Sequence, residues 1–195
     1  MAEHRITLPL TDDTIARLHA GDYVYLTGDL LTARDAAHKR MCETLGNGES
    51  LPVDIRGQVI YYVGPTPAKP GAIIGSAGPT TSERMDGFTI PLLEVGLKGA
   101  IGKGGRSQAV REAFAKHEAV YFLAVGGAGA LLSKQIRSVE VVAYEDLGTE
   151  AIRRITVEDF PAIVCNDIYG ADALQQGKAE WRREEILHPQ TAPSS

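Results

Sequence analysis

Apolar runs alternate along this chain with segments that repeat apolar residues at helical spacing. The short runs are rich in β-branched and aromatic residues and are bounded by turn residues, which is typical of buried strands. The expected strands cover residues 6–10, 23–26, 59–63, 99–102, 120–125, 139–144, 155–157 and 162–165. Because strands and helices interleave throughout, the pattern predicts an α/β fold, a single layered domain with a sheet of mixed order.

Residues that favour helix ends bound the expected helices. Side chains suited to the N-cap position precede three helical segments, at Thr11, Thr32 and Ser107. Glycines follow the first two of these segments, at Gly21 and Gly46, where a left-handed residue can end a helix. A brief further helix is expected after the glycine-rich stretch 126–129.

The length of 195 residues favours one domain, and no internal repeat or long linker interrupts the pattern. We expect this domain to cover residues 1–185. Proline, serine and threonine replace the apolar pattern near the end of the chain, so residues 186–195 are expected to form a flexible tail.

Composition and charge restrict the classes of function. No apolar run approaches the about 20 residues that cross a bilayer, and the N-terminus lacks the apolar core of a secretory signal, so we expect a cytoplasmic protein. A formal net charge of −5 disfavours a nucleic-acid or membrane-surface role, which depends on a positive field. Small molecules and protein partners remain.

Cysteine content limits metal binding. Cys42 and Cys165 are the two cysteines of the chain, too few to ligate an iron-sulfur cluster or a structural zinc without help from another chain. Their apolar surroundings suit small buried side chains. We therefore expect this chain alone to bind no metal.

Turn residues are concentrated between residues 64 and 79, which contain three prolines before the one at position 79 and several glycines. Loops of this length in compact domains usually have a function, such as ligand binding. The segment from Thr80 to Glu83 that follows matches a capping box, so we expect a helix to begin there.

The first candidate site is the start of the second expected helix. Arg34 and His38 lie four residues apart and therefore share one helical face, with Asp35 beside them. An arginine can grip a carboxylate through two parallel hydrogen bonds, and a histidine can carry a proton near neutral pH. The alternative is an ordinary solvated helix face.

A second candidate is the end of the glycine- and proline-rich loop, where Thr80 and Arg84 are again four residues apart. The free N–H groups at the start of a helix suit an anion, and Arg84 could close over it. The alternative is a plain helix cap beside an exposed arginine.

The third candidate is Lys103, which glycines flank between an expected strand and an expected helix. Glycine allows the backbone to approach a ligand closely, and lysine supplies a compact positive charge. The spacing does not match a Walker A loop, and a surface turn is the alternative.

Taken in order, these motifs resemble the beta subunit of two-subunit class I fumarate hydratases and the C-terminal domain of the single-chain members. The resemblance extends from residue 6 to about residue 170 and departs from the family pattern at 166–170. It rests on the segments Tyr25-Leu26-Thr27-Gly28, Ala33-Arg34-Asp35-Ala36-Ala37-His38, Tyr62-Val63-Gly64-Pro65, Gly78-Pro79-Thr80-Thr81, Arg84-Met85-Asp86, Gly102-Lys103-Gly104, the run 143–148 and the run 157–162.

The resemblance implies a swivelling β/β/α architecture and a partner alpha subunit that carries a four-iron four-sulfur cluster with one iron left open. It implies substrate-binding roles for Arg34, Arg84 and Lys103, and the role of catalytic base for Thr80. His38 is a further catalytic candidate, and Asp35 is our own inference as a supporting partner. The expected reaction is the reversible hydration of fumarate to (S)-malate, for which this chain is incomplete without its alpha subunit.

Two other functions stay open. The related L-tartrate dehydratase beta subunit shares most of the motifs but tends to have glutamate where this chain has Asp86, which favours fumarate. Alternatively, the chain is a noncatalytic anion-binding module that kept the cationic residues without a catalytic partner.

Overall fold

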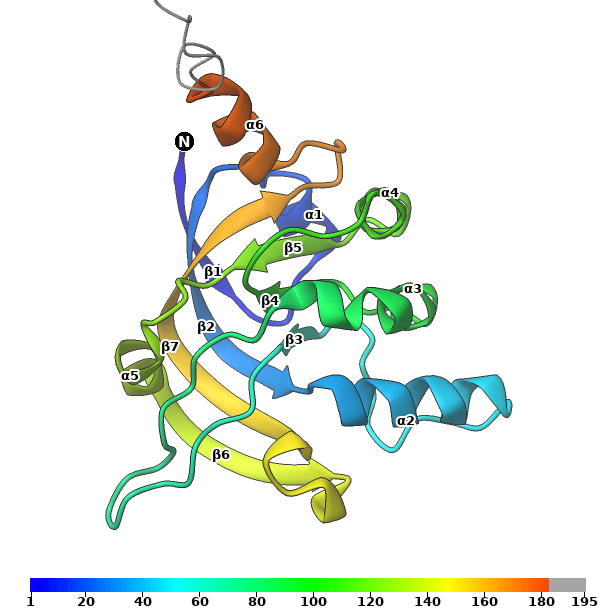
Figure 1. Cartoon of the computed structure of the whole chain (residues 1–195), viewed down its shortest axis with the longest axis vertical. Helices are drawn as coiled ribbons and strands as arrows, with labels where there is room; N and C mark the ends of the chain where they lie inside the picture. Colours follow the sequence, from blue (N-terminus) through cyan, green and yellow to red (C-terminus); the bar gives the residue numbers. More distant parts are fainter. Residues whose placement is uncertain (183–195) are drawn as a thin grey trace, which may run out of the picture.

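Five strands of the sheet close on themselves. The computed structural model describes residues 1–182, so the expected tail at 186–195 lies outside the described residues. The strands are β1 (Glu3–Thr7), β2 (Tyr23–Thr32), β3 (Val59–Tyr61), β4 (Gly99–Gly102), β5 (Val120–Leu123), β6 (Ile136–Ala143) and β7 (Ile152–Asn166). Their order is β1-β2-β3-β4-β5-β7-β6, and a further pairing of β2 with β7 closes the ring β2-β3-β4-β5-β7. The expected α/β class is confirmed, and the sheet is barrel-like (Figure 1).

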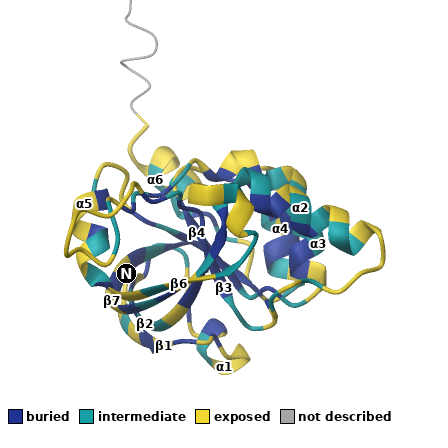
Figure 2. Ribbon diagram, turned by 90° about the horizontal axis from the view of Figure 1, so that it is seen from below, coloured by how far each residue is buried: buried dark blue, intermediate teal, exposed yellow. Residues whose placement is uncertain are grey.

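The neighbouring pairs from β1 to β5 are parallel, whereas β7 runs antiparallel to β2, β5 and β6. Parallel strands that follow one another along the chain need crossover connections, and helices supply most of them here. They are α2 (Asp35–Gly46), α3 (Asp86–Glu94) and α4 (Gln108–Lys116). All three cover the same side of the sheet and turn their buried faces toward the strands (Figure 2).

Two expected strands are one strand in the structure. Residues 155–157 and 162–165 both belong to β7, because the polar residues between them form a bulge opposite the register shift between Leu26 and Gly28. Asp159 has a φ of 50° in this bulge, and its N–H donates to Thr27 Oγ1 over 3.1 Å. The first expected strand was also misplaced, since β1 pairs as an edge strand with β2 alone and tolerates polar residues at 3–5.

Two hydrophobic cores lie on opposite faces of the sheet. Neighbouring residues such as Tyr121 and Phe122 point to opposite faces, which explains why β3, β4 and β5 are buried on both sides and read as continuous apolar runs. The interior of the ring contains Leu26, Tyr61, Ile101, Phe122, Ile155 and Phe160, whereas Met41, Tyr62, Leu92, Phe114 and Tyr121 pack between the sheet and the helices.

Shorter helices complete the described part of the chain. They are α1 (Asp12–Ile15), α5 (Gly129–Leu132), α6 (Ala173–Glu180) and the 3-10 turns η1 (Ser82–Met85), η2 (Ser133–Gln135) and η3 (Glu145–Glu150). The stretch 166–170 forms the turn before α6, in which Asp167 Oδ1 accepts the N–H groups of Tyr169 and Ala171. Among residues 1–182, no helix combines the length and the apolar character needed to span a bilayer.

Two helix starts differ in detail from the expected caps. Thr32 still belongs to β2, so Arg34 is the N-cap of α2 and makes no side-chain capping bond. Ser107 is the N-cap of α4 as expected, but its side chain makes no capping bond either, and its N–H donates to Asp86 Oδ2 over 2.7 Å. In both places the cap depends on a partner from elsewhere in the chain.

We predict that Phe122→Ala lowers the free energy of unfolding by about 3 to 5 kcal/mol, because it leaves a cavity inside the closed ring. The Phe122 side chain is 0% exposed, whereas nearby Val125 is 63% exposed and serves as the control in Val125→Ala. Urea unfolding of the full chain, followed by circular dichroism, measures both. Equal unfolding midpoints for the two variants would contradict the assignment of Phe122 to a closed core.

Candidate active site

The candidate site residues lie at one edge of the sheet, where three parallel strands end. Arg34 follows β2, Gly64 follows β3 and Lys103 directly follows β4. Since β2, β3 and β4 run parallel, their carboxyl ends meet at the same edge (Figure 1). In sheets of this kind, ligands bind beyond the carboxyl ends of the strands. The sequence placed the first two candidate segments at helix starts and the third between a strand and a helix, and the sheet brings these segments to one edge.

Thr80 lies in an extended segment between the ends of β3 and β4. Its N–H donates to Tyr62 O over 2.7 Å, and the Lys103 N–H donates to Thr80 O over 3.2 Å. The Ser82 N–H then donates to Lys103 O over 3.0 Å. Thr80 is thus held through its backbone like a residue of a short additional strand.

This arrangement corrects the expected capping box. Thr81, and not Thr80, is the N-cap of η1, and it makes no side-chain capping bond, while α3 begins only at Asp86. Thr80 and Arg84 therefore do not share a helical face. Within the described part of the chain no hydrogen bond engages Thr80 Oγ1, so its hydroxyl is available to a ligand.

Gly102 allows the Thr80 segment to lie this close to β4. A Cβ at this position would overlap Ser82 Oγ and lie 3.0 Å from Tyr62 Cδ2. The Tyr121 hydroxyl reaches the same place and lies 2.8 Å from both Ser82 Oγ and Gly104 O. The glycine before Lys103 is therefore required by packing, independently of any ligand.

Arg34, Asp35 and Arg84 form one charged cluster, so the first two candidate sites are parts of the same site. Arg84 Nε donates to Asp35 Oδ1 over 2.8 Å. Arg34 Nη2 lies 3.7 Å from Asp35 Oδ2, which is longer than a hydrogen bond. Arg34 Nε and Asp35 Oδ2 are buried and have no hydrogen-bond partner among residues 1–182. The cluster therefore holds its arginines in place and leaves part of their donor capacity unused.

Glu150 is a site residue that sequence reasoning missed. Its Oε2 accepts the Ala36 N–H over 2.8 Å, and its Oε1 lies 3.6 Å from Arg34 Nη2. The carboxylate caps the start of α2, where the helix dipole favours negative charge, and also faces Arg34. Because 114 residues separate Glu150 from Ala36, the local pattern around either residue carries no signal for this contact.

Gly64 is a second residue that sequence reasoning missed as part of the site. A Cβ at Gly64 would lie 2.5 Å from Arg34 Nη1 and 2.9 Å from Arg34 Cδ, so the arginine lies directly against the bare backbone. The signal in the sequence was a glycine directly after an expected buried strand. A larger residue here would displace the guanidinium.

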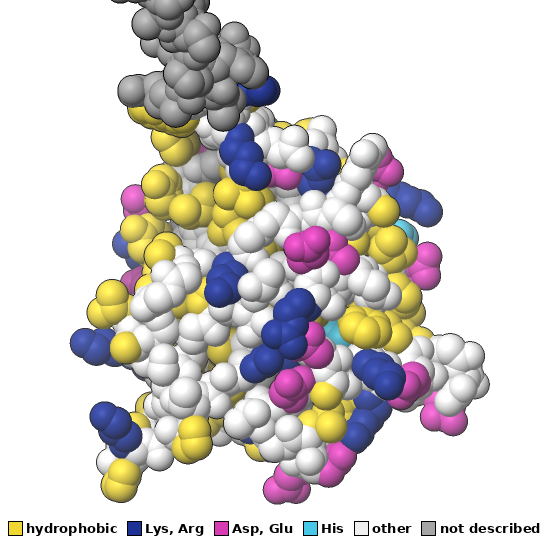
Figure 3. All heavy atoms as spheres, viewed as in Figure 1, with side chains coloured by type: hydrophobic (Ala, Val, Ile, Leu, Met, Phe, Trp, Pro, Cys, Tyr) yellow, Lys and Arg dark blue, Asp and Glu magenta, His cyan; other side chains and the backbone are white. Residues whose placement is uncertain are grey.

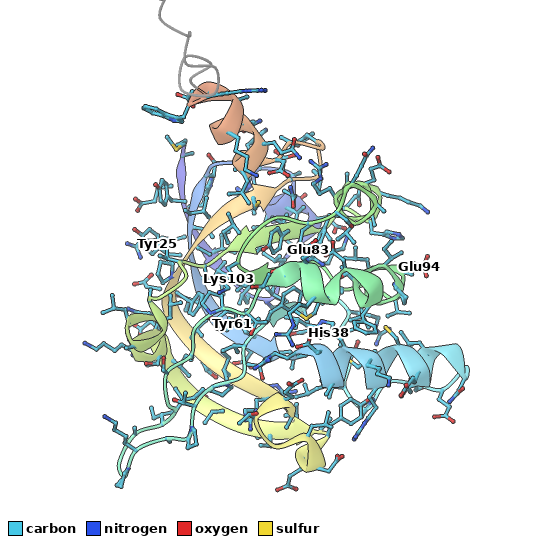
Figure 4. The ribbon with its side chains drawn as sticks, viewed as in Figure 1. Tyr25, His38, Tyr61, Glu83, Glu94 and Lys103 are labelled. Atoms are coloured by element: carbon cyan, nitrogen blue, oxygen red, sulfur yellow. The ribbon has the colours of Figure 1, made fainter. Side chains whose placement is uncertain are left out.

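Lys103 projects from the edge of the sheet with no close counter-ion. The residue is exposed, and in the range 1–182 no carboxylate lies within ion-pair distance of its Nζ. It lies beside the start of α3 (Figure 4). Basic side chains gather in the middle of this face, with acidic side chains next to them (Figure 3).

Beneath these residues, Arg106 is fully enclosed. Its Nε donates to Asp86 Oδ1 over 2.6 Å, and its Nη2 donates to Thr89 Oγ1 over 2.6 Å. Nη1 donates to the Tyr62 hydroxyl over 3.3 Å, and the guanidinium carbon lies 5.5 Å from the centre of the Tyr62 ring. Burial opposes the charged form, yet the Tyr62 oxygen and the Asp86 carboxylate raise the pKa of Arg106 above its usual value.

The Arg106 and Asp86 pair connects segments that carry different site residues. Asp86 follows Arg84 by two residues, and its second oxygen binds the N–H of Ser107. The sequence identified Asp86 only as a marker of substrate preference and assigned no role to Arg106. Both are structural supports of the site, and neither showed this role in its local pattern.

His38 lies behind the first turn of α2 and is 0% exposed. Its Nδ1 lies 2.8 Å from Arg34 O, and its ring meets the Tyr62 ring edge-on with centroids 5.1 Å apart. Burial lowers the pKa of His38 to about 4, with the positive charge of Arg106 acting in the same direction and the bond to Arg34 opposing it. His38 is therefore neutral near pH 7. Figure 4 shows its side chain near the start of α2.

Groups suited to metal binding do not gather in the described part of the chain. Among residues 1–182, no three histidine, cysteine or acidic side chains are placed to share a metal ion. Cys165 is buried, and burial raises the pKa of its thiol to about 12, while Cys42 is half-buried. The side chains at this site are instead suited to bind a small anion.

Comparisons with known proteins identify relatives of this chain. The aerobic class I fumarate hydratase of Escherichia coli K12 is 43% identical over 153 residues, which are 77% of this chain and 28% of that protein. This chain thus spans little more than a quarter of that relative.

Two smaller relatives are matched over most of their length. A putative L(+)-tartrate dehydratase subunit beta of Methanocaldococcus jannaschii is 36% identical over 86% of this chain and 89% of that protein. The L(+)-tartrate dehydratase subunit beta of Escherichia coli K12 is 33% identical over 93% of this chain and 92% of that protein.

The family described as Fumarase C-terminus matches residues 2–177, a range that includes every site residue above. The resemblance to class I fumarate hydratases and tartrate dehydratase beta subunits is thereby confirmed. By this match over most of its length, the chain belongs to the Fumarase C-terminus family.

Proposed function

We propose that this chain is the beta subunit of a two-subunit class I fumarate hydratase, which hydrates fumarate reversibly to (S)-malate together with a cluster-bearing alpha subunit. The observation that carries the proposal is the meeting of Arg34, Arg84 and Lys103 beside the free hydroxyl of Thr80 at one edge of the sheet. Membership in a family of hydro-lyases supports the reaction class. We further propose the swivelling β/β/α architecture and a cytoplasmic location.

Binding of a dicarboxylate would use the donors that the site leaves unoccupied. Arg84 engages Asp35 through Nε, and among residues 1–182 its two terminal nitrogens have no hydrogen-bond partner. Such a fork fits a planar carboxylate in two parallel bonds. Arg34 and Lys103 supply two more positive charges for the second carboxylate, and the Arg34 contacts of 3.6 and 3.7 Å leave it able to bind.

Thr80 is proposed to move the proton at the carbon that gains or loses hydrogen. A threonine hydroxyl is a weak base, so it requires nearby positive charge that stabilises its deprotonated form. Bonds of 2.7 and 3.2 Å hold the Thr80 backbone on both sides. The open iron of the partner's cluster would supply Lewis-acid chemistry at the hydroxyl group.

The second candidate function is that of an L-tartrate dehydratase beta subunit. It is favoured by the coverage of 89% and 92% of the two relatives that carry this name. The higher identity of 43% to a fumarate hydratase favours the first candidate. Both reactions remove water from a hydroxylated dicarboxylate, so the same cationic residues would serve either substrate.

The proposal predicts that the purified full chain holds no stoichiometric iron and shows no hydratase turnover, but gains turnover with a cluster-bearing partner under anaerobic conditions. Iron analysis and the ultraviolet absorbance of fumarate measure both properties, and oxaloacetate formation measures tartrate dehydration. Turnover by the chain alone would overturn the subunit assignment. Faster turnover of tartrate would establish the second candidate, and an iron-loaded complex inactive on both substrates would favour the noncatalytic anion-binding module.

We predict that Thr80→Val lowers turnover of the reconstituted complex by about two powers of ten or more, the scale for losing a general base. Valine keeps the branched shape and both backbone hydrogen bonds while it removes the hydroxyl. Steady-state kinetics on malate measure the effect. Thr156→Val, at a hydroxyl that donates to Asp29 Oδ1 outside the site, is the control. Near-normal turnover in Thr80→Val would limit Thr80 to a structural role.

Gly64→Ala tests Arg34 without altering the arginine itself. The new methyl group would lie 2.5 Å from Arg34 Nη1, and the flexible arginine side chain can move aside, so the fold survives while the guanidinium is displaced. Loss of a charge-assisted bond predicts a fall of about tenfold or more in kcat/KM.

The matched control is Gly87→Ala, where an added Cβ has no atom within 4 Å. Its kinetics should equal those of the wild type, and thermal unfolding should show both variants folded. Unchanged kcat/KM in Gly64→Ala would place Arg34 outside the substrate site.

A further inference from the structure

His38 is a buried polar side chain that has no role in the mechanism proposed above. It is 0% exposed, and its Nε2 has no hydrogen-bond partner among residues 1–182. Burial of a polar ring nitrogen without a partner costs free energy, so a compensating contact elsewhere on the ring is expected. That contact is the bond between Nδ1 and the backbone of Arg34.

The Arg34 carbonyl accepts two hydrogen bonds from the same residue. The His38 backbone N–H donates to Arg34 O over 2.8 Å, and His38 Nδ1 lies at the same distance of 2.8 Å from that oxygen. A carbonyl oxygen can only accept, so Nδ1 carries the hydrogen and Nε2 carries the lone pair. The contact therefore selects one neutral tautomer of the imidazole.

This bond acts at the point where β2 becomes α2. Arg34 is the N-cap of α2 and has no side-chain capping bond of its own, so its backbone depends on other contacts for a fixed position. From that backbone the guanidinium extends along Gly64 toward Glu150. The His38 ring also meets Tyr62, whose carbonyl binds the N–H of Thr80.

We propose that His38 is a positioning residue that acts through Arg34, and that it transfers no proton in the reaction. The proposal rests on the proposed function of the site, since it assigns Arg34 to substrate binding. His38 holds the arginine backbone through its Nδ1–H group, and its ring supports Tyr62 behind the Thr80 segment.

The surroundings of His38 agree with a permanently neutral ring. Asp35 on its own helix favours the charged form, whereas Arg106, which packs against Tyr62 from the loop after β4, disfavours it. Burial is the largest effect and lowers the pKa to about 4. A general base is most effective when its pKa lies near the working pH, which does not hold for this group.

The first experiment needs neither a variant nor a partner. Nitrogen-15 imidazole NMR of the full chain alone should show His38 as the Nδ1–H tautomer, with unchanged shifts between about pH 6 and 8 because its pKa lies well below that range. An Nε2–H tautomer, or a titration within this range, would overturn the proposal. The result is independent of turnover, so the failure of the proposed function would be recognised separately.

The second experiment compares two amides in the reconstituted complex. Asparagine places an N–H donor near the position of Nδ1, whereas glutamine places it near the position of Nε2. We expect His38→Asn to stay within about fivefold of wild-type kcat/KM, and His38→Gln to raise KM about tenfold or more with little change in kcat. His117→Gln, outside the site, should leave the kinetics unchanged.

A double substitution separates positioning from general support of the fold. If His38 acts through Arg34, His38→Gln should add little to the kcat/KM defect of Arg34→Lys, because both substitutions disturb the same contact of Arg34 with the substrate. Equal collapse of kcat in His38→Asn and His38→Gln, with thermal unfolding intact, would overturn the proposal. So would full additivity of the two substitutions.

Discussion

The buried ion pair between Arg106 and Asp86 is the contact on which the geometry of the site depends. The Arg106 side chain is 0% exposed and binds Asp86, Thr89 and Tyr62 at once. Asp86 in turn caps α4 through the Ser107 N–H. Removal of either charged partner would leave an uncompensated charge in the interior, at a cost of about 3 to 5 kcal/mol. The turn that carries Arg84 and the loop that follows Lys103 are therefore held in a fixed relation.

Polar groups in the supporting layer are satisfied, whereas several in the site above it are not. Arg106 uses all three guanidinium nitrogens, but Arg34 Nε, Asp35 Oδ2 and His38 Nε2 are buried without partners among the described residues. Unmade hydrogen bonds of this kind lower stability and are kept where they serve a ligand or hold a geometry. The hydrogen-bonded network around Arg106 offsets the free-energy cost of these unsatisfied groups, so the site can retain them.

The closed sheet explains why one domain can present residues from so many segments. The loops that follow three parallel strands lie at one edge of the sheet. Because β7 pairs with β2 and closes the ring, the strand ends at this edge keep fixed positions. Relatives include a fumarate hydratase that is much longer than this chain and tartrate dehydratase beta subunits of similar length. Similar sequences thus occur both within a longer chain and as a separate subunit.

Local pattern was sufficient for the elements and for the cationic residues. It placed β4 at 99–102, Arg34, Thr80 and Arg84 at expected helix starts, and Lys103 between an expected strand and an expected helix, because apolar periodicity and turn chemistry act over a few residues. Only the tertiary structure decided four further features. They are the pairing of β2 with β7, the capping of α2 by Glu150, the contact of Gly64 with Arg34 and the network around Arg106. The capping box failed for the same reason, since the backbone of Thr80 binds Tyr62 and Lys103 instead. Each of these contacts joins segments that lie far apart along the chain, and the sequence near either partner does not specify which distant group will meet it.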